Sequence, residues 1–149
     1  MEELSTLDRA IRLQNVDLFS DLKTDMLALV ASIAKQVRVE ADETLFERDS
    51  AMEALYVVLD GRIAMRRDEA RLFSVGPDET IGNWALFDEQ PSVVTAIAES
   101  ETWLLRIDRE DFFDLLADHS DVSRALFQAL FKRARALLKV GLDSGDGAS

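Results

Sequence analysis

The spacing of apolar residues changes twice along the chain, and these changes constrain the fold more than any other feature of the sequence. Up to Lys35, and again after Asp108, apolar residues recur about every 3.6 residues, which is typical of helices with one buried face. Between these points the period falls to about two, as in Val37 and Val39, which is typical of strands. Helices and strands grouped separately along a chain predict an α+β domain rather than alternating strand–helix units.

The middle segment, residues 36–107, predicts about eight short antiparallel strands separated by tight turns. The pair Asp60-Gly61 predicts a hairpin. Residues 55–59 form a continuous run of β-prone apolar residues, which predicts a strand covered on both faces. Short strands at this spacing are typical of a barrel or roll, so we expect an antiparallel, jelly-roll-like β-roll.

The flanking segments predict two helices before the roll and two after it. Ser5 is the expected cap of the first helix, over residues 4–14, and the last helix is expected from Ser120 to about Val140. We expect a single domain over residues 1–140, made of N-terminal helices (1–35), the β-roll (36–107) and C-terminal helices (108–140), followed by a flexible tail at residues 141–149.

Composition argues against several classes of function. The net charge of −12 would repel nucleic acid and anionic membranes. There is no apolar run near the ~20 residues of a membrane helix, and the acidic N-terminus does not resemble a signal peptide. One histidine, no cysteine and no convincing nucleophile–base pair leave little for catalysis. We therefore expect a cytoplasmic protein that is not an enzyme, holds no metal, and has no nucleic-acid or membrane partner.

Residues 76–98 carry the strongest signals for unusual backbone geometry. They contain both prolines and two of the six glycines of the chain. Gly82 precedes a short apolar run that predicts one helical turn. The start of a helix presents unpaired backbone N–H groups, which can hold an anion. This stretch is therefore a candidate anion-binding site.

Five stretches resemble the cyclic-nucleotide-binding domain family, in its order and nearly in its spacing. This family provides the ligand module of catabolite-activator-type regulators, of cyclic-nucleotide-dependent kinase regulatory subunits and of some channels. The stretches are residues 16–19, 43–46, 55–63, 76–98 and 104–112, so that the resemblance covers roughly residues 12–138. It implies a β-roll capped by helices, in agreement with the periodicity, and no DNA-binding domain follows the roll within this sequence.

The resemblance also implies a phosphate-binding cassette, with a Phe-Gly-Glu triplet, an Ala-Leu pair and a later Pro-Arg pair. In the family, backbone N–H groups and the arginine hold the cyclic phosphate, and the glutamate takes the ribose 2′-hydroxyl. This chain keeps Gly82, Ala85, Leu86 and Pro91. It has Asn83 at the glutamate position and Ser92 at the arginine position. Loss of a charged hydrogen-bond partner costs about 1.5–3 kcal/mol, or one to two decades in affinity.

We therefore expect a regulatory or interaction module with a degenerate cassette, which does not bind cyclic AMP or cyclic GMP in the usual way and has no cofactor. The candidate site residues are Gly82, Asn83, Trp84, Ala85, Leu86, Ser92 and Val93. Two alternatives stay open. Either Trp84 and Phe87 fill the space that a ligand would occupy, or the altered site still senses a cyclic nucleotide or another small anion. The hairpin arginines that could replace the missing one are Arg62, Arg66, Arg67 and Arg71.

The expected last helix carries two adjacent apolar stripes. One consists of Val122, Leu126, Leu130 and Leu137, and the other of Phe127, Phe131, Ala134 and Leu138. One stripe is expected to pack on the roll, whereas the second needs another chain, unless both are buried within one monomer. We expect a homodimer or a partner protein at this helix, with Val122, Leu126, Phe127, Leu130, Phe131 and Leu137 as the candidate interface.

Overall fold

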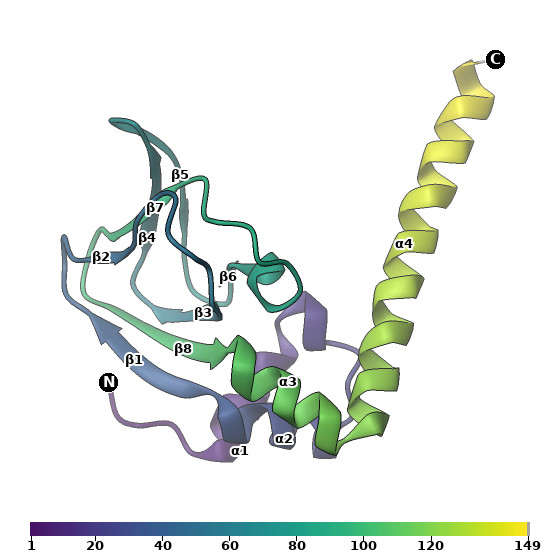
Figure 1. Cartoon of the computed structure of the whole chain (residues 1–149), viewed down its shortest axis with the longest axis horizontal. Coiled ribbons are helices and arrows are strands. Elements are labelled where there is room, and N and C mark those ends of the chain that lie inside the picture. Colours follow the sequence, from purple (N-terminus) through teal and green to yellow (C-terminus); the bar gives the residue numbers. More distant parts are fainter. Residues whose placement is uncertain (149) are drawn as a thin grey trace.

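A computed structural model describes residues 1–148, with the side chains of Asn83, Trp84 and residues 143–148 outside the described set. The helices flank a two-sheet roll (Figure 1). In chain order the elements are α1 (Thr6–Gln14), the 3₁₀ turn η1 (Asp17–Phe19), α2 (Thr24–Ile33), β1 (Lys35–Val39), β2 (Thr44–Phe46), β3 (Ala54–Asp60), β4 (Ile63–Arg67), β5 (Ala70–Val75), β6 (Thr80–Ile81), the 3₁₀ turn η2 (Asn83–Leu86), β7 (Thr95–Ala98), β8 (Thr102–Asp108), α3 (Arg109–Asp118) and α4 (Ser120–Ala148).

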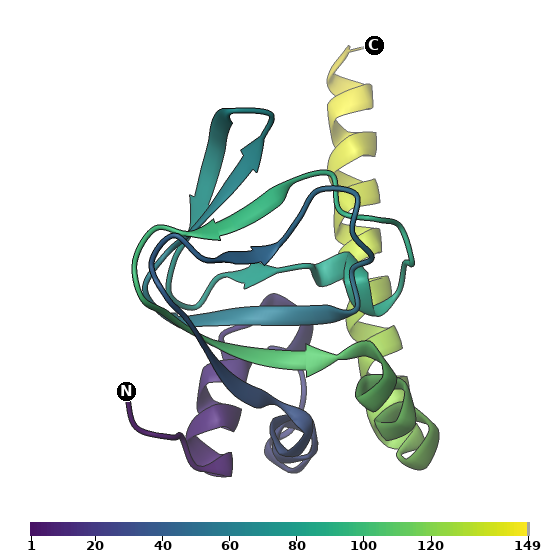
Figure 2. The same ribbon diagram turned by 60° about the vertical axis from the view of Figure 1, so that its left-hand side comes forward.

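The eight strands form two four-stranded antiparallel sheets, which confirms the predicted β-roll. One sheet has the order β1-β8-β3-β6 and the other has the order β2-β7-β4-β5. The N-terminal helices and α3 lie against the first sheet, and the β4–β5 hairpin projects beyond the roll (Figure 2). One apolar core fills the space between the two sheets, and a second fills the space between the first sheet and the helices.

β3 is buried on both faces, as its unbroken apolar run predicts. Leu55, Val57 and Leu59 pack into the core shared with the helices. Tyr56 and Val58 point the other way, into the core between the sheets. Because successive side chains of a strand alternate between faces, a strand between two cores needs apolar residues at every position.

The Asp60-Gly61 turn does not form the predicted hairpin. β3 pairs with β6 and β8, whereas β4 pairs with β5 and β7, so this turn carries the chain from one sheet to the other. Gly61 has φ +94°, and a Cβ atom there would lie 2.5 Å from the carbonyl oxygen of Glu101. The glycine is therefore required by its backbone conformation and by this close approach. The Asp-Gly pair correctly indicated a tight turn, but which sheet the next strand joins is decided by packing beyond the turn.

The helices flanking the roll begin close to their predicted positions. Ser5 caps α1, because its hydroxyl accepts a hydrogen bond from the Asp8 backbone N–H at 3.1 Å. Asp108 precedes α3, but its side chain makes no capping hydrogen bond. Its carboxylate instead accepts hydrogen bonds from Lys35 Nζ at 2.8 Å and Arg106 Nε at 2.5 Å. Partial burial raises the pKa of Asp108, but these two donors outweigh it and hold that pKa below its ordinary value.

α4 is longer than the sequence analysis predicts. It continues past Val140 to Ala148 and so includes most of the predicted tail. Gly141 lies inside the helix, and both prolines of the chain lie in the roll, so this stretch contains no residue that must end a helix. The predicted flexibility of the tail, residues 141–149, is not tested and stays a prediction. No helix in the described part of the chain has the length and apolar character that a membrane span requires.

Candidate functional site

Gly82 lies between β6 and the predicted helical turn, which is η2. It has φ +80°, and a Cβ atom there would lie 2.9 Å from the carbonyl oxygen of Ala54. The Ala85 N–H closes the turn on the Gly82 carbonyl oxygen at 2.8 Å. Ala85 and Leu86 are both buried, and Leu86 packs in the core shared with the helices. The predicted helical turn is therefore present, preceded by a glycine that both its conformation and the close contact require.

Ser92, at the position of the family's arginine, uses its side chain locally. It is buried, with 8% of its surface exposed. Its hydroxyl donates to the carbonyl oxygen of Val94 at 2.7 Å and lies 3.2 Å from the Val94 backbone nitrogen, from which it accepts. The backbone on either side is tied to the preceding loop through Asp49 and Ser50. Ser92 thus stabilises its own turn and supplies no positive charge.

A cavity of about 390 Å³ lies beside the cassette, within the roll. It is lined by Phe46, Met52, Met65, Phe73, Val75, Thr80, Ile81, Gly82, Ala85, Asp88, Gln90, Pro91, Ser92, Val93 and Val94. Four of the predicted site residues, Gly82, Ala85, Ser92 and Val93, therefore come together around one space. Leu86 does not line it, and the side chains of Asn83 and Trp84 lie outside the described set.

The described walls of this cavity carry no positive charge. Asp88 is the one ionisable residue among them, and none is lysine, arginine or histidine. None of the four hairpin arginines lines the cavity. Arg62 Nε donates to Ser74 Oγ at 3.3 Å, and Arg71 Nε pairs with Glu99 Oε1 at 2.5 Å. The structure therefore gives no support to a replacement arginine from these hairpins.

Phe87 lies outside the roll cavity. Its ring meets that of Phe112 on α3 edge to face, with centroids 5.9 Å apart. It also lines a groove of about 660 Å³ between the roll and α4, where Leu130 and Leu137 form part of the opposite wall. The alternative in which Phe87 fills the ligand space is not supported, and the same alternative for Trp84 falls outside the described side chains.

Arg109 is a site residue that the sequence analysis did not identify. It is the first residue of α3, and only 17% of its side chain is exposed. Its Nε donates to the carbonyl oxygen of Ala85 at 2.5 Å, and its Nη2 donates to that of Met52. A cation at a helix N-terminus opposes the helix dipole, so this unfavourable position was the available signal of a tertiary role. Arg109 joins the cassette to the C-terminal helices.

The predicted interface on α4 divides into a buried part and an exposed part. Val122 and Leu126 are buried against the rest of the chain. The other predicted residues are exposed, with Phe127 at 63%, Leu130 at 38%, Phe131 at 68% and Leu137 at 75%. α4 leaves the body of the molecule over its second half (Figure 1). The apolar surface of α4 that the rest of the chain leaves uncovered is therefore large.

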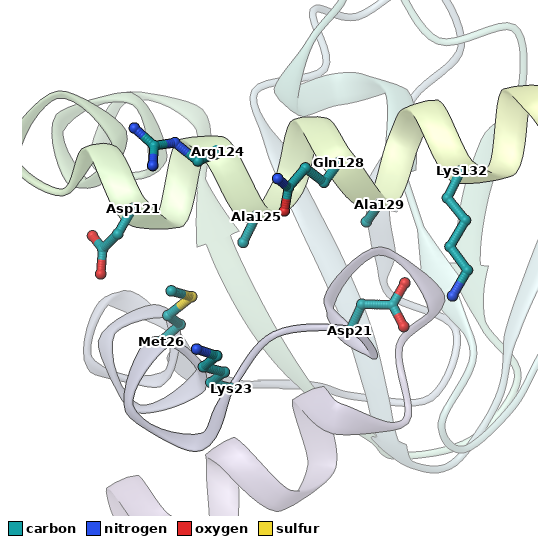
Figure 3. Close-up of a pocket in the computed structure, with 9 residues that line it drawn as sticks. All are labelled: Asp21, Lys23, Met26, Asp121, Arg124, Ala125, Gln128, Ala129 and Lys132. Carbon is teal, nitrogen blue, oxygen red and sulfur yellow. The ribbon is translucent and has the colours of Figure 1, made fainter.

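A second hollow, of about 490 Å³, lies between α4 and the start of α2 (Figure 3). Asp121, Arg124 and Lys132 reach it from α4, and Asp21 and Lys23 from the opposite side. Its charges are of both signs, and it contains none of the predicted site residues. Among the described residues, no group of three or more histidine, cysteine, aspartate or glutamate side chains is placed to hold a metal ion.

The two-sheet roll, the turn after Gly82 and the cavity beside it define a β-roll ligand domain flanked by helices. The sequence model of the cyclic nucleotide-binding domain matches residues 36–119, which is more than half of the chain. The chain therefore belongs to the cyclic nucleotide-binding domain family.

Two curated proteins similar to this chain are named as regulators. The chain is 23% identical over 128 residues to a CRP-like cAMP-activated global transcriptional regulator of Mycobacterium tuberculosis, covering 83% of this chain and 57% of that protein. It is 28% identical over 138 residues to a cAMP-dependent protein kinase regulatory subunit of Eremothecium gossypii, covering 93% of this chain and 30% of that protein. Among solved structures, the N-terminal domain of a transcriptional regulator from Streptomyces coelicolor has a TM-score of 0.79 at 30% identity, covering 85% of this chain and 94% of that one. The chain thus spans well under two thirds of the length of these two curated relatives.

Proposed function

We propose that this chain is a regulatory module whose cassette has lost its grip on a cyclic phosphate. In this proposal it acts through its C-terminal helices, as a homodimer or beside a partner protein. It is not an enzyme, and it works in the cytoplasm. Family membership and the regulatory relatives support the general class, and the residues of the cassette support the particular role.

Ser92 is the single observation that carries the proposal. Its hydroxyl is committed to the Val94 backbone, and the described walls of the cavity contain no cation. A phosphate transferred from water into this site would lose hydration without gaining a charged partner, and it would approach the Asp88 carboxylate. Such a site disfavours cyclic AMP and cyclic GMP.

Isothermal titration calorimetry with cyclic AMP, cyclic GMP and cyclic dinucleotides tests this proposal. We expect no saturable heat at micromolar ligand. Micromolar binding of any of these nucleotides would refute the degenerate cassette.

A second candidate function is a sensor that uses the altered site. The observation in its favour is that the cavity beside Gly82 is open, at about 390 Å³, which is within the range of small-molecule sites. A thermal-shift screen of nucleotides and small anions tests it, because a ligand that binds the native state must raise the melting temperature. A screen without any stabilising compound would count against this candidate.

The proposed interface on α4 is supported by the exposed aromatic pair Phe127 and Phe131. Monomeric proteins seldom leave large apolar patches in water, and such patches mark interaction sites. Covering them with a second copy or a partner would also bury other exposed apolar side chains of the helix, such as Leu137 and Leu138.

A further inference from the structure

We propose that the roll cavity binds an uncharged, mainly apolar small molecule with a single hydroxyl or amide donor, in place of a phosphate-bearing ligand. This inference rests on the proposed loss of the phosphate grip. It goes further by assigning a chemical class of ligand to the space that remains.

The walls of the cavity favour an apolar molecule. Met65 and Val75 come from the second sheet, Ile81 comes from the first, and all three are buried. Small-molecule sites are lined mainly by such side chains, with a few polar groups that set the orientation. An apolar ligand would displace water from these walls, which is the dominant favourable contribution to binding of this kind.

The exposed residues that line the cavity also favour an apolar ligand. Phe73 and Val93 both line the cavity, and 55% and 68% of their surfaces are exposed. A ligand can gain apolar contact area by packing against these two exposed side chains, and the buried core does not have to move. A ligand that extends to the rim would cover both.

The one charged residue among the described walls, Asp88, is exposed, and its carboxylate disfavours an anion and favours a donor. The Asp88 carboxylate accepts one hydrogen bond, from the Gln90 backbone N–H at 3.2 Å, and retains further acceptor capacity. An O–H or N–H group of a ligand can use that capacity. A phosphate cannot, because it brings a second negative charge to the carboxylate without a cation between them.

The four methionines of the chain allow a direct test. Met52 and Met65 line the cavity, whereas Met26 lines the separate hollow beside α4 and Met1 is exposed at the N-terminus. The full chain is labelled with ¹³C at the methionine methyl groups and titrated with 1-naphthol. A parallel titration uses 1-naphthyl phosphate, which keeps the same rings and replaces the hydroxyl with an anion.

We expect 1-naphthol to shift the Met52 and Met65 signals saturably, with the Met1 and Met26 signals unchanged. Affinity for 1-naphthyl phosphate is expected to be at least about tenfold weaker, which corresponds to one lost charge-compensating interaction. If no probe moves Met52 or Met65, the inference is wrong while the degenerate cassette stands. If the phosphate binds equally or more tightly, both the inference and the proposed function are wrong.

Two variants tie the shifts to the cavity. Val94→Phe places a ring in the cavity wall and is expected to weaken 1-naphthol binding at least about tenfold, whereas Leu7→Phe adds the same ring at an exposed position on α1 and leaves binding unchanged. Phe73→Ala provides a second test at an exposed position that folding does not need, and it is expected to weaken binding as well. Full binding in both cavity variants would overturn the assignment.

Discussion

Arg109 holds the cassette through hydrogen bonds to backbone carbonyl oxygens, and its substitution should lower the free energy of unfolding. Its guanidinium donates to Ala85, Met52 and, at 3.4 Å, Asp88. Arg109→Met keeps the length of the side chain but leaves these acceptors without their donor. We expect a loss of about 1–3 kcal/mol in the free energy of unfolding, measured with urea. Arg67→Met, at an exposed position on β4, is the matched control, and equal losses in the two variants would contradict this role.

Asp108 should make stability depend on pH. Because its pKa is lowered in the folded state, its contribution is fully present above its unfolded pKa of about 3.9 and is lost as the pH falls through the folded value. Asp108→Asn should therefore be less stable than the natural chain at pH 7, and the difference should shrink below about pH 4. Urea unfolding across this pH range measures it. Parallel stability curves for the two proteins would show that the carboxylate is not held as described.

The cassette can be tested by restoring its two polar residues. Asn83→Glu combined with Ser92→Arg returns the ribose partner and the phosphate partner of the family pattern. We expect affinity for cyclic AMP to rise by about one to two decades, measured by calorimetry. Val93→Arg adds the same charge at the neighbouring residue, which is 68% exposed, and should restore much less. Equal effects would mean that a general change of charge, and not the cassette geometry, controls binding.

α4 is the element on which the proposed assembly depends. Phe127→Glu and Phe131→Glu place charges on its exposed stripe, where burial against a second chain would be costly. We expect the double variant to be monomeric under conditions in which the natural chain forms a dimer, measured by sedimentation equilibrium. Gln128→Glu adds one charge at an exposed position beside this stripe and should leave assembly unchanged. A natural chain that is monomeric at high concentration would contradict the homodimer and leave the partner protein.

Individual elements were predictable wherever short-range signals and packing agree. The unbroken apolar run of β3 indicated a strand between two cores, and Ser5 indicated the start of α1. The Asp60-Gly61 turn was predicted to join paired strands, but pairing depends on partners such as β8, more than forty residues away in the sequence. The end of α4 was placed at about Val140 because the residues from Gly141 on are small and polar, although one glycine costs a helix only about 1 kcal/mol and does not end it by itself.

The candidate site was predictable in its backbone and less so in its contacts. Gly82 and Ser92 were found from spacing and resemblance, since both are fixed by local geometry. Arg109 was missed because its acceptors are the backbone carbonyl oxygens of Met52, Ala85 and Asp88. Every residue has such an oxygen, so the residue types at these positions do not reveal the contact. Its cationic side chain at a helix start was the one local irregularity that pointed to it.

The molecule as a whole combines a strongly acidic chain with a cavity whose described walls carry no cation. A net charge of −12 disfavours the approach of an anionic ligand over long distances, and the described walls of the cavity offer it no cation. The cassette, Arg109 and Phe87 nevertheless form a continuous path of contacts from the roll cavity to α3. The molecule therefore has the architecture of a cyclic nucleotide-binding domain, for which we propose a changed ligand preference.

The most direct test of the central claim is a calorimetric titration of cyclic AMP into the natural chain and into the Asn83→Glu, Ser92→Arg variant, side by side. We expect no saturable binding to the natural chain at micromolar nucleotide and clear binding to the variant. Micromolar binding to the natural chain would show that the cassette holds a phosphate without the arginine, and it would contradict the account.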